Sequence, residues 1–181
     1  MPQNLTSDEL LALAGKVLDI ESLAGIRLVV FDVDGVLTDG RFYLSNDGVE
    51  SKAFSTQDGY GIRRLIQAGI TVAVISGRSS VAVDIRMQDL GVEHVFQGCK
   101  DKVAVFEDLT ATLGITADEC AFVGDDIPDL ALLQKVGYSV AVANAVSAVR
   151  EQCDYTTLAD GGYGAVREVC DLIITAQEAT R

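Results

Sequence analysis

Two carboxylates, Asp32 and Asp34, stand directly after the apolar run Val29-Val30-Phe31. A run rich in β-branched and aromatic residues is typical of a strand buried on both faces, where charges do not belong. We therefore expect both acids at its carboxyl end, the edge at which open α/β sheets bind ligands. Carboxylates this close repel each other, and a hard, oxygen-seeking cation such as Mg²⁺ removes the repulsion. The spacing predicts a magnesium site, with an acidic turn as the alternative.

Polar groups follow two further predicted elements. Ser76 and Gly77 come directly after the apolar run 70–75, where a hydroxyl and the amides of the next helix can hold a phosphate. A simple helix N-cap at Ser76 is the alternative. Lys102 stands near the start of a predicted helix, where the helix dipole disfavours a cation. This position indicates an anionic partner, with a solvated lysine as the alternative.

An acidic segment follows the apolar run 120–123 and opens another predicted helix. It carries Asp125, Asp126 and Asp129, which is more acid than a helix cap requires. We expect Asp125 to ligate the metal, because a carboxylate at this sheet edge lies near the first acidic pair. Asp129, one turn further on, is a candidate to orient Lys102.

The composition limits the class of protein and its partners. A chain of 181 residues with 49% hydrophobic and 23% charged residues is expected to form one globular domain. Its net charge of −13 argues against nucleic-acid and membrane-surface binding, which require basic patches. We find no apolar run of membrane-spanning length and no basic start of a secretory signal. We therefore expect a cytoplasmic protein with reduced cysteines and no zinc site.

Along the chain, helical and strand patterns alternate. Thr6 and Glu9 form a capping-box signal for a helix ending near Asp19, and Asn46-Asp47-Gly48 is typical of a hairpin turn. The predicted class is α/β: a three-layer, doubly wound, mostly parallel sheet with a small hairpin flap at 40–55. The expected domain is 1–181, with a helical extension at 1–25. The expected strands are 27–33, 70–75, 94–97, 120–123 and 138–142, and the expected helices are 58–68, 80–90, 100–113, 126–136 and 165–177.

The order of these motifs resembles the haloacid dehalogenase superfamily of phosphatases. The resemblance lies in Asp-x-Asp-Gly-Val-Leu-Thr-Asp, then a serine, a lysine and Gly-Asp-x-x-x-Asp. Asp58-Gly-Tyr-Gly-Ile62 and Gly-Gly-x-Gly-Ala-Val-Arg-Glu168 are similar to its capless 3-deoxy-D-manno-octulosonate 8-phosphate phosphatase group. The resemblance runs from Ile26 to Gln177 and implies the Rossmann-like core of that superfamily, without a cap domain.

The resemblance also implies roles for the residues and a cofactor. Asp32 would be the nucleophile, and Asp34 would act as general acid and then as general base. Mg²⁺ would be held by the Asp32 carboxylate, the Asp34 carbonyl and Asp125. The phosphoryl oxygens would be bound by Ser76, the Gly77 amide and Lys102, with Asp126 and Asp129 in support. Members of this group close the site with the hairpin and a neighbouring subunit, which implies a homotetramer.

The implied substrate is a sugar-acid phosphate, 3-deoxy-D-manno-octulosonate 8-phosphate. The candidates for contact with the sugar are Gln57, Arg64, Arg78, Tyr163 and Arg167. Gln57 and Tyr163 stand where relatives of this group carry basic residues. A nonulosonate 9-phosphate or a neutral sugar phosphate is therefore an alternative substrate.

Two other classes of protein share some of these features. A signalling receiver domain also combines acids, a hydroxyl, a lysine and Mg²⁺, but its phospho-acceptor lies apart from its acidic pair. A non-catalytic assembly domain with this fold is expected to lose Asp32 or Asp34, and this chain keeps both. The motifs therefore favour a phosphatase over either class.

Overall fold

The computed structural model describes residues 19–180. The helix predicted from Thr6 falls outside the described residues except for Asp19, which caps the short helix α2, Ile20–Ala24. The Asp19 carboxylate accepts a hydrogen bond from the Ser22 amide at 3.0 Å. It lies within the helical extension expected at 1–25, but as a separate helix after Asp19, and its five residues are too few for a helical period to be recognised.

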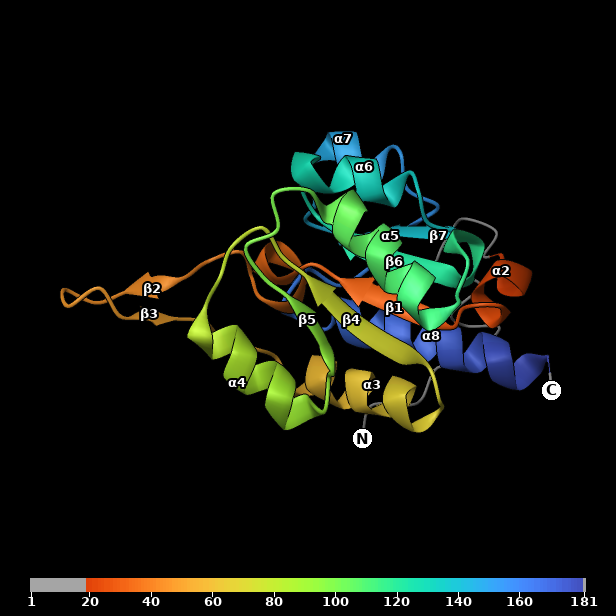
Figure 1. Ribbon diagram of the computed structural model, residues 1–181, viewed down its shortest axis with the longest axis horizontal. Coiled ribbons are helices and arrows are strands. Elements are labelled where there is room, and N and C mark those ends of the chain that lie inside the picture. Colours follow the sequence, from red (N-terminus) through yellow and green to blue (C-terminus); the bar gives the residue numbers. More distant parts are fainter. Residues whose placement is uncertain (1–18, 181) are drawn as a thin grey trace.

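A six-stranded parallel sheet in the order β5-β4-β1-β6-β7-β8 organises the fold (Figure 1). Its strands are β1 (Leu28–Phe31), β4 (Thr71–Ile75), β5 (His94–Phe96), β6 (Cys120–Gly124), β7 (Tyr138–Ala141) and β8 (Tyr155–Thr156). From β1 the chain builds the sheet outward on one side and then returns to build the other from β6. The order reverses between β1 and β6, which is where such sheets bind ligands. The predicted doubly wound α/β class is confirmed.

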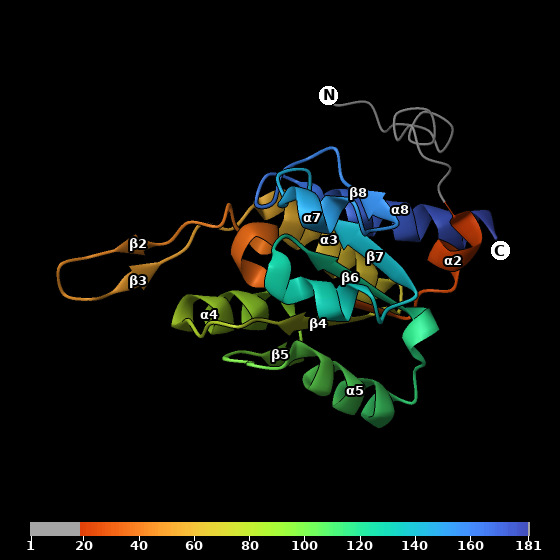
Figure 2. The ribbon, with the colours of Figure 1, turned by 90° about the horizontal axis from the view of Figure 1, so that it is seen from above.

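Helices cover both faces of the sheet, as Figures 1 and 2 show from two directions. On one face α3 packs along α8, α8 contacts α2, and α4 contacts α3; α5 and α6 contact each other on the opposite face. Their bounds are α3 (Thr56–Gln67), α4 (Val81–Leu90), α5 (Lys102–Leu113), α6 (Leu130–Leu133), α7 (Ser147–Arg150) and α8 (Ala165–Ala179). Within residues 19–180, no helix combines the length and apolar character needed to cross a bilayer.

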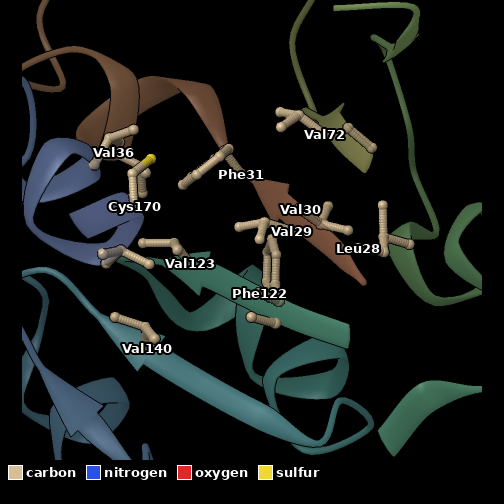
Figure 3. Packing of buried hydrophobic residues seen from close by; sticks show 14 of the residues in the cluster. Leu28, Val29, Val30, Phe31, Val36, Val72, Phe122, Val123, Val140 and Cys170 are labelled. Carbon is tan, nitrogen blue, oxygen red and sulfur yellow. The ribbon is translucent and has the colours of Figure 1, made fainter. Parts of the chain in front are cut away.

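Strand β1 lies at the centre of the hydrophobic core. Its four residues are completely buried, and Figure 3 shows Val29 and Val30 among side chains that include Phe122. Burial of each such side chain contributes about 1.5–3 kcal/mol, so β1 is firmly anchored between its neighbours. The segment that begins at Asp32 therefore starts from a fixed point in the molecule.

The structure differs from the prediction after β6 and near the chain's end. The helix expected at 126–136 is a 3₁₀ turn, Ile127–Asp129, followed by α6, which ends at Leu133. Asp126 and Asp129 cap that turn with their side chains, which favours the tighter winding at its start. Helix α7 and strand β8 were not predicted, because four and two residues are too few to show a period.

A β-hairpin projects from the body of the molecule at the carboxyl end of β1 (Figures 1 and 2). Its strands are β2, Tyr43–Leu44, and β3, Glu50–Ser51, which pair antiparallel. The turn carries Gly48 at a positive φ of 78°, as expected for Asp-Gly turn chemistry. Its apolar side chains Tyr43, Leu44 and Val49 are 61–66% exposed, so the tip is not packed against its own chain.

The glycine-rich loop before α8 lies against the turn that follows β1. The Gly162 amide donates a hydrogen bond to the Val36 carbonyl at 2.9 Å. A Cβ atom at Gly161 would stand 1.6 Å from the Gly35 carbonyl oxygen, so any larger residue must displace one of the two backbones. This contact explains the adjacent glycines at 161 and 162, and it braces the turn that carries Asp34.

Replacement of Gly161 by alanine is expected to move the turn after β1 and to destabilise the protein. Overpacking of this kind costs about 1–3 kcal/mol, which lowers Tm by roughly 2–10 °C for a domain of this size. Gly25→Ala is the matched control, because its added Cβ meets only ordinary contacts from 3.5 Å outward. Thermal unfolding measures both variants, and equal Tm values for the two would contradict the bracing contact.

Candidate active site

The carboxyl ends of β1, β4 and β6 meet at a cavity of about 320 Å³. Because parallel strands end at the same sheet edge, residues far apart in sequence are brought together there. The cavity is lined by Asp32, Asp34, Gly40, Ser76, Gly77, Arg78, Lys102, Asp125, Asp126, Pro128 and Asp129. Every predicted metal and phosphate residue is therefore at one place, although their chemical roles stay predictions.

A turn after β1 presents the first two carboxylates. Asp32 leaves the strand in extended conformation, and a wide helical turn over Val33–Leu37 follows. Gly35 adopts a φ of 92° inside this turn, and a Cβ there would stand 2.0 Å from Asp125 Oδ2. Glycine is therefore required at 35 for two reasons, since it allows the turn and leaves room for the Asp125 carboxylate.

Lys102 joins the two sides of the site. Its Nζ lies 2.7 Å from Asp32 Oδ1 and 2.7 Å from Asp129 Oδ1, and its side chain is only 9% exposed. The other oxygen of Asp129 accepts the Asp125 amide at 3.0 Å. Asp129 therefore orients both Lys102 and the loop that carries Asp125. The sequence analysis predicted its contact with Lys102 but not its contact with the loop.

The crowding of carboxylates changes their protonation. Burial, and then the charge of Asp129, raises the pKa of Asp32 to about 6, although Lys102 opposes the shift. Burial, and then the charges of Asp32 and Asp129, raises the pKa of Asp125 to about 7. Burial lowers the pKa of Lys102, but the adjoining carboxylates outweigh it and the pKa is raised. The site thus holds more negative charge than one lysine balances.

The carboxylates form a set that suits a hard cation. Oxygens of Asp32, Asp125 and Asp129 lie within 4.8 Å of one another. Both oxygens of Asp129 are engaged by Lys102 and by backbone amides. Asp32 is engaged by Lys102 through Oδ1. Asp32 and Asp125 are therefore the better candidates for ligands, and all-oxygen donors favour Mg²⁺ or a similar divalent ion.

The loop after β4 places Ser76 and Gly77 in the lining of the same cavity as the acids. Ser76 is buried, its amide donates to the Phe96 carbonyl, and its Oγ accepts the Arg78 amide at 3.4 Å. The N-cap residue of α4 is Ser80, so Ser76 does not serve as the simple cap that was its alternative explanation. Its position supports the phosphate-binding interpretation.

Lys52 and Glu50, at the base of the hairpin, were missed by the sequence analysis. Lys52 Nζ forms an ion pair with Asp34 Oδ1, and Arg78 Nη2 lies 2.8 Å from Glu50 Oε2. The available signal was their spacing, because residues two apart on a strand face the same side. What this side of the hairpin contacts depends on the direction in which the hairpin leaves the sheet. The sequence pattern does not specify that direction.

Of the five residues proposed to contact a sugar, only Arg78 lines the cavity. Arg64 forms an ion pair with Asp171 that joins α3 to α8, and Arg167 pairs with the same carboxylate at 2.7 Å within α8. Gln57 is exposed, as is Tyr163 at 67%. None of these four residues lines the cavity of the single chain.

Known proteins resemble this chain in sequence. A family model described as haloacid dehalogenase-like hydrolase matches residues 94–166. The chain is 48% identical over 158 residues to the 3-deoxy-D-manno-octulosonate 8-phosphate phosphatase KdsC of Escherichia coli (strain K12). That match covers 87% of this chain and 84% of the relative.

Solved structures resemble it in fold as well. The 3-deoxy-D-manno-octulosonate 8-phosphate phosphatase of Moraxella catarrhalis, in complex with magnesium ion, phosphate ion and KDO, has a TM-score of 0.86 and 45% identity. The match covers 88% of this chain and 91% of that one. The cobalt-bound deoxy-D-mannose-octulosonate 8-phosphate phosphatase of Haemophilus influenzae has a TM-score of 0.84 and 41% identity, covering 87% and 92%.

The raised pKa values predict how stability depends on pH and metal. In the unfolded chain the carboxyl groups of Asp32 and Asp125 titrate at roughly pH 4. Between that pH and about pH 7, the folded protein without metal therefore binds more protons at these two residues than the unfolded chain does. The contribution of Asp32 and Asp125 to stability therefore falls as the pH rises. At pH 8 and without metal, the free energy of unfolding of Asp125→Asn is expected to be about 1 kcal/mol larger than that of wild type. This difference corresponds to a rise in Tm of roughly 2–4 °C.

Mg²⁺ should raise the Tm of the wild type at pH 8 more than at pH 5, and should barely affect Asp125→Asn. Thermal unfolding with Mg²⁺ or with a chelator measures this. Asp126→Asn is the control, because this exposed neighbour only caps the 3₁₀ turn and should leave the response to Mg²⁺ intact. An Asp125→Asn protein that gains as much from Mg²⁺ as the wild type would show that Asp125 is not a ligand.

Proposed function

Because the chain belongs to the 3-deoxy-D-manno-octulosonate 8-phosphate phosphatase family of haloacid dehalogenase-like hydrolases, we propose that it hydrolyses this sugar-acid phosphate through an aspartyl phosphate on Asp32. The observation that carries the proposal is the buried Lys102, whose ammonium joins Asp32 to Asp129 beside Asp125. Asp32 also lines the cavity, together with Ser76 and Gly77, so its second carboxylate oxygen is available to a phosphoryl group bound there.

In the first step a carboxylate oxygen of Asp32 attacks phosphorus, and the bond between phosphorus and the sugar oxygen breaks. The electron pair of that bond stays on the sugar oxygen, which takes a proton from the Asp34 carboxyl group. Lys102, the Ser76 hydroxyl and the Gly77 amide donate hydrogen bonds to the phosphoryl oxygens. These donors stabilise the charge of the transition state from fixed positions.

In the second step Asp34, now a carboxylate, takes a proton from a water molecule as the water oxygen attacks phosphorus. The bond between phosphorus and Asp32 breaks, which releases phosphate and restores the carboxylate. Asp34 must therefore give a proton in one step and accept one in the next from the same position. Its location on the cavity, next to Asp32 in sequence, suits both tasks.

Mg²⁺ is the proposed cofactor, held by the carboxylates of Asp32 and Asp125 and by the Asp34 carbonyl. The bound ion would neutralise charge on the phosphoryl oxygens and on the crowded carboxylates. The Moraxella relative was obtained with magnesium and the Haemophilus relative with cobalt, which supports a divalent cation at this site. Asp129 holds the Asp125 loop in place, and Asp126 supports it only by capping the 3₁₀ turn that follows.

Discrimination for the sugar acid is assigned to Arg78 and to residues of a neighbouring chain. Half of the Arg78 side chain is exposed at the cavity, where it can meet a carboxylate. Gln57 and Tyr163 are neutral and cannot form the charge-assisted contact that an arginine makes. We therefore expect only modest preference for the octulosonate over a nonulosonate 9-phosphate or a neutral sugar phosphate.

The functional unit proposed here is a cytoplasmic homotetramer in which the hairpin of one chain packs on another. The exposed apolar tip residues Tyr43, Leu44 and Val49 support this assembly, because such side chains on a projecting hairpin favour a protein contact. Light scattering at micromolar concentration is expected to give the mass of four chains. A fully active monomer would exclude the assembly, and Leu44→Asp is expected to reduce the mass.

Asp32→Asn is expected to abolish turnover, because an amide does not attack phosphorus, while the fold remains intact. Phosphate release from a panel of acidic and neutral sugar phosphates measures activity and preference together. A fall in kcat of at least about 10⁴-fold is expected, since covalent catalysis is lost altogether. Folded Asp32→Asn protein with near-wild-type turnover would refute the assignment of the nucleophile.

A further inference from the structure

Lys52 lies at the base of the hairpin, immediately after β3, and its charge is enclosed by protein. Its side chain is 1% exposed, and its Nζ contacts Asp34 Oδ1 and lies 3.4 Å from Glu50 Oε1. An enclosed ammonium is costly unless it is paired, so these two carboxylates determine where Lys52 lies. Equally, Lys52 determines the position of one oxygen of Asp34.

Arg78 completes a closed group of four charges. Its Nη2 lies 2.8 Å from Glu50 Oε2, and its Nε lies 3.6 Å from Asp34 Oδ2. The Phe42 ring packs beside both cations, 4.3 Å from Arg78 Cζ and 5.7 Å from Lys52 Nζ. The base of the hairpin, the turn after β1 and the loop after β4 therefore meet through Lys52, Glu50, Arg78 and Asp34.

Lys52 does not face the substrate directly. Asp34 and Arg78 line the cavity among the described residues, whereas Lys52 does not. Lys52 therefore reaches the cavity only through its partners. Its direct partner at the cavity is the Asp34 carboxylate, and Glu50 links it to Arg78.

We propose that Lys52 is a positioning residue, which holds the Asp34 carboxylate where it exchanges protons with the leaving oxygen and with water. The proposal rests on the role given to Asp34 in the proposed function. Oδ1 of Asp34 is bound to Lys52, whereas Oδ2 lies 3.6 Å from Arg78 Nε, beyond hydrogen-bond distance, and so remains for proton transfer. A proton-transfer group must lie within hydrogen-bond reach of its partner, and a misplacement of about 1 Å can cost about 10²-fold in rate.

This assignment gives the hairpin a second purpose. Besides offering its tip to a neighbour, it supplies from its base the residue that sets the geometry of proton transfer. The hairpin and Asp34 then move together, so that displacement of the base releases the carboxylate. A lysine that only stabilised the fold would affect all substrates alike, which makes the two roles separable by experiment.

The test compares Lys52→Met with wild type on two substrates. A sugar phosphate has a poor leaving group that needs a proton, whereas p-nitrophenyl phosphate has a good one that does not. For the sugar phosphate, kcat is expected to fall by about 30-fold or more with KM within about 3-fold, as general acid catalysis contributes about 10²–10⁴-fold.

For p-nitrophenyl phosphate, rapid-mixing measurements on Lys52→Met should show a burst of one p-nitrophenolate per active site at a near-wild-type rate. Slow steady-state release should follow, because Asp34 no longer activates water well against the aspartyl phosphate. The burst shows that the nucleophile is intact in the same sample. A variant that fails to fold would show no burst and would also lose cooperative thermal unfolding.

Three further variants sharpen the comparison. Lys52→Arg keeps the cation and should recover a large part of the sugar-phosphate rate. Glu50→Gln weakens the contact of the hairpin with Arg78 but keeps Lys52 beside Asp34. It should therefore not show the burst of p-nitrophenolate that is expected for Lys52→Met. Lys135→Met removes a lysine that pairs with Glu107 on the surface, and should leave both rates unchanged.

Equal losses of Lys52→Met on both substrates, including the burst rate, would overturn the positioning role in favour of a structural one. No loss on either substrate would overturn it as well, as would a burst in Glu50→Gln equal to that of Lys52→Met. Failure of the proposed function looks different, because wild type itself would then form no aspartyl phosphate and Asp32→Asn would stay active.

Discussion

The mutual repulsion of three carboxylates, Asp32, Asp125 and Asp129, is the constraint on which the site depends. Their oxygens lie within 4.8 Å of one another in a largely buried setting, where like charges are costly. One lysine, Lys102, offsets part of that repulsion, and proton uptake or a bound cation can offset the remainder. The anchored strand β1 and the backbone-bound Asp129 hold the acids in place against it. The clustered acids thus lower the stability of the fold at the place where we propose that metal and phosphate bind.

Much of this arrangement could be predicted from the sequence because it follows from strand ends. Asp32, Ser76 and Asp125 each come directly after a strongly apolar run, and parallel strands must end at one edge. The contact between Asp129 and Lys102 could also be expected, since Asp129 lies one helical turn after Asp125. In these cases local pattern and sheet topology together determine the neighbourhood.

Other parts depended on how separate elements are oriented, which local patterns do not encode. Arg64 was expected to face a sugar, but it pairs with Asp171 because α3 packs along α8. Arg167, also expected to face a sugar, pairs with the same carboxylate one turn further along α8. Lys52 was overlooked because its partner Asp34 becomes a neighbour only when the hairpin folds back to the turn after β1. The short α7 and β8 carry too few residues for a period, so only tertiary packing defines them.

The pairing of β1 with β6 has a consequence for the newly made chain. Leu28 pairs with Cys120, about 90 residues later, so β1 leaves the ribosome long before its second neighbour exists. Until then one edge of a fully apolar strand is open, and such an edge readily pairs with the wrong chain. The nascent chain also carries Asp32, the proposed nucleophile, before Asp125, so the proposed metal site is incomplete until β6 is made. The covering of β1 and the completion of the proposed site therefore both depend on the entry of β6 into the sheet.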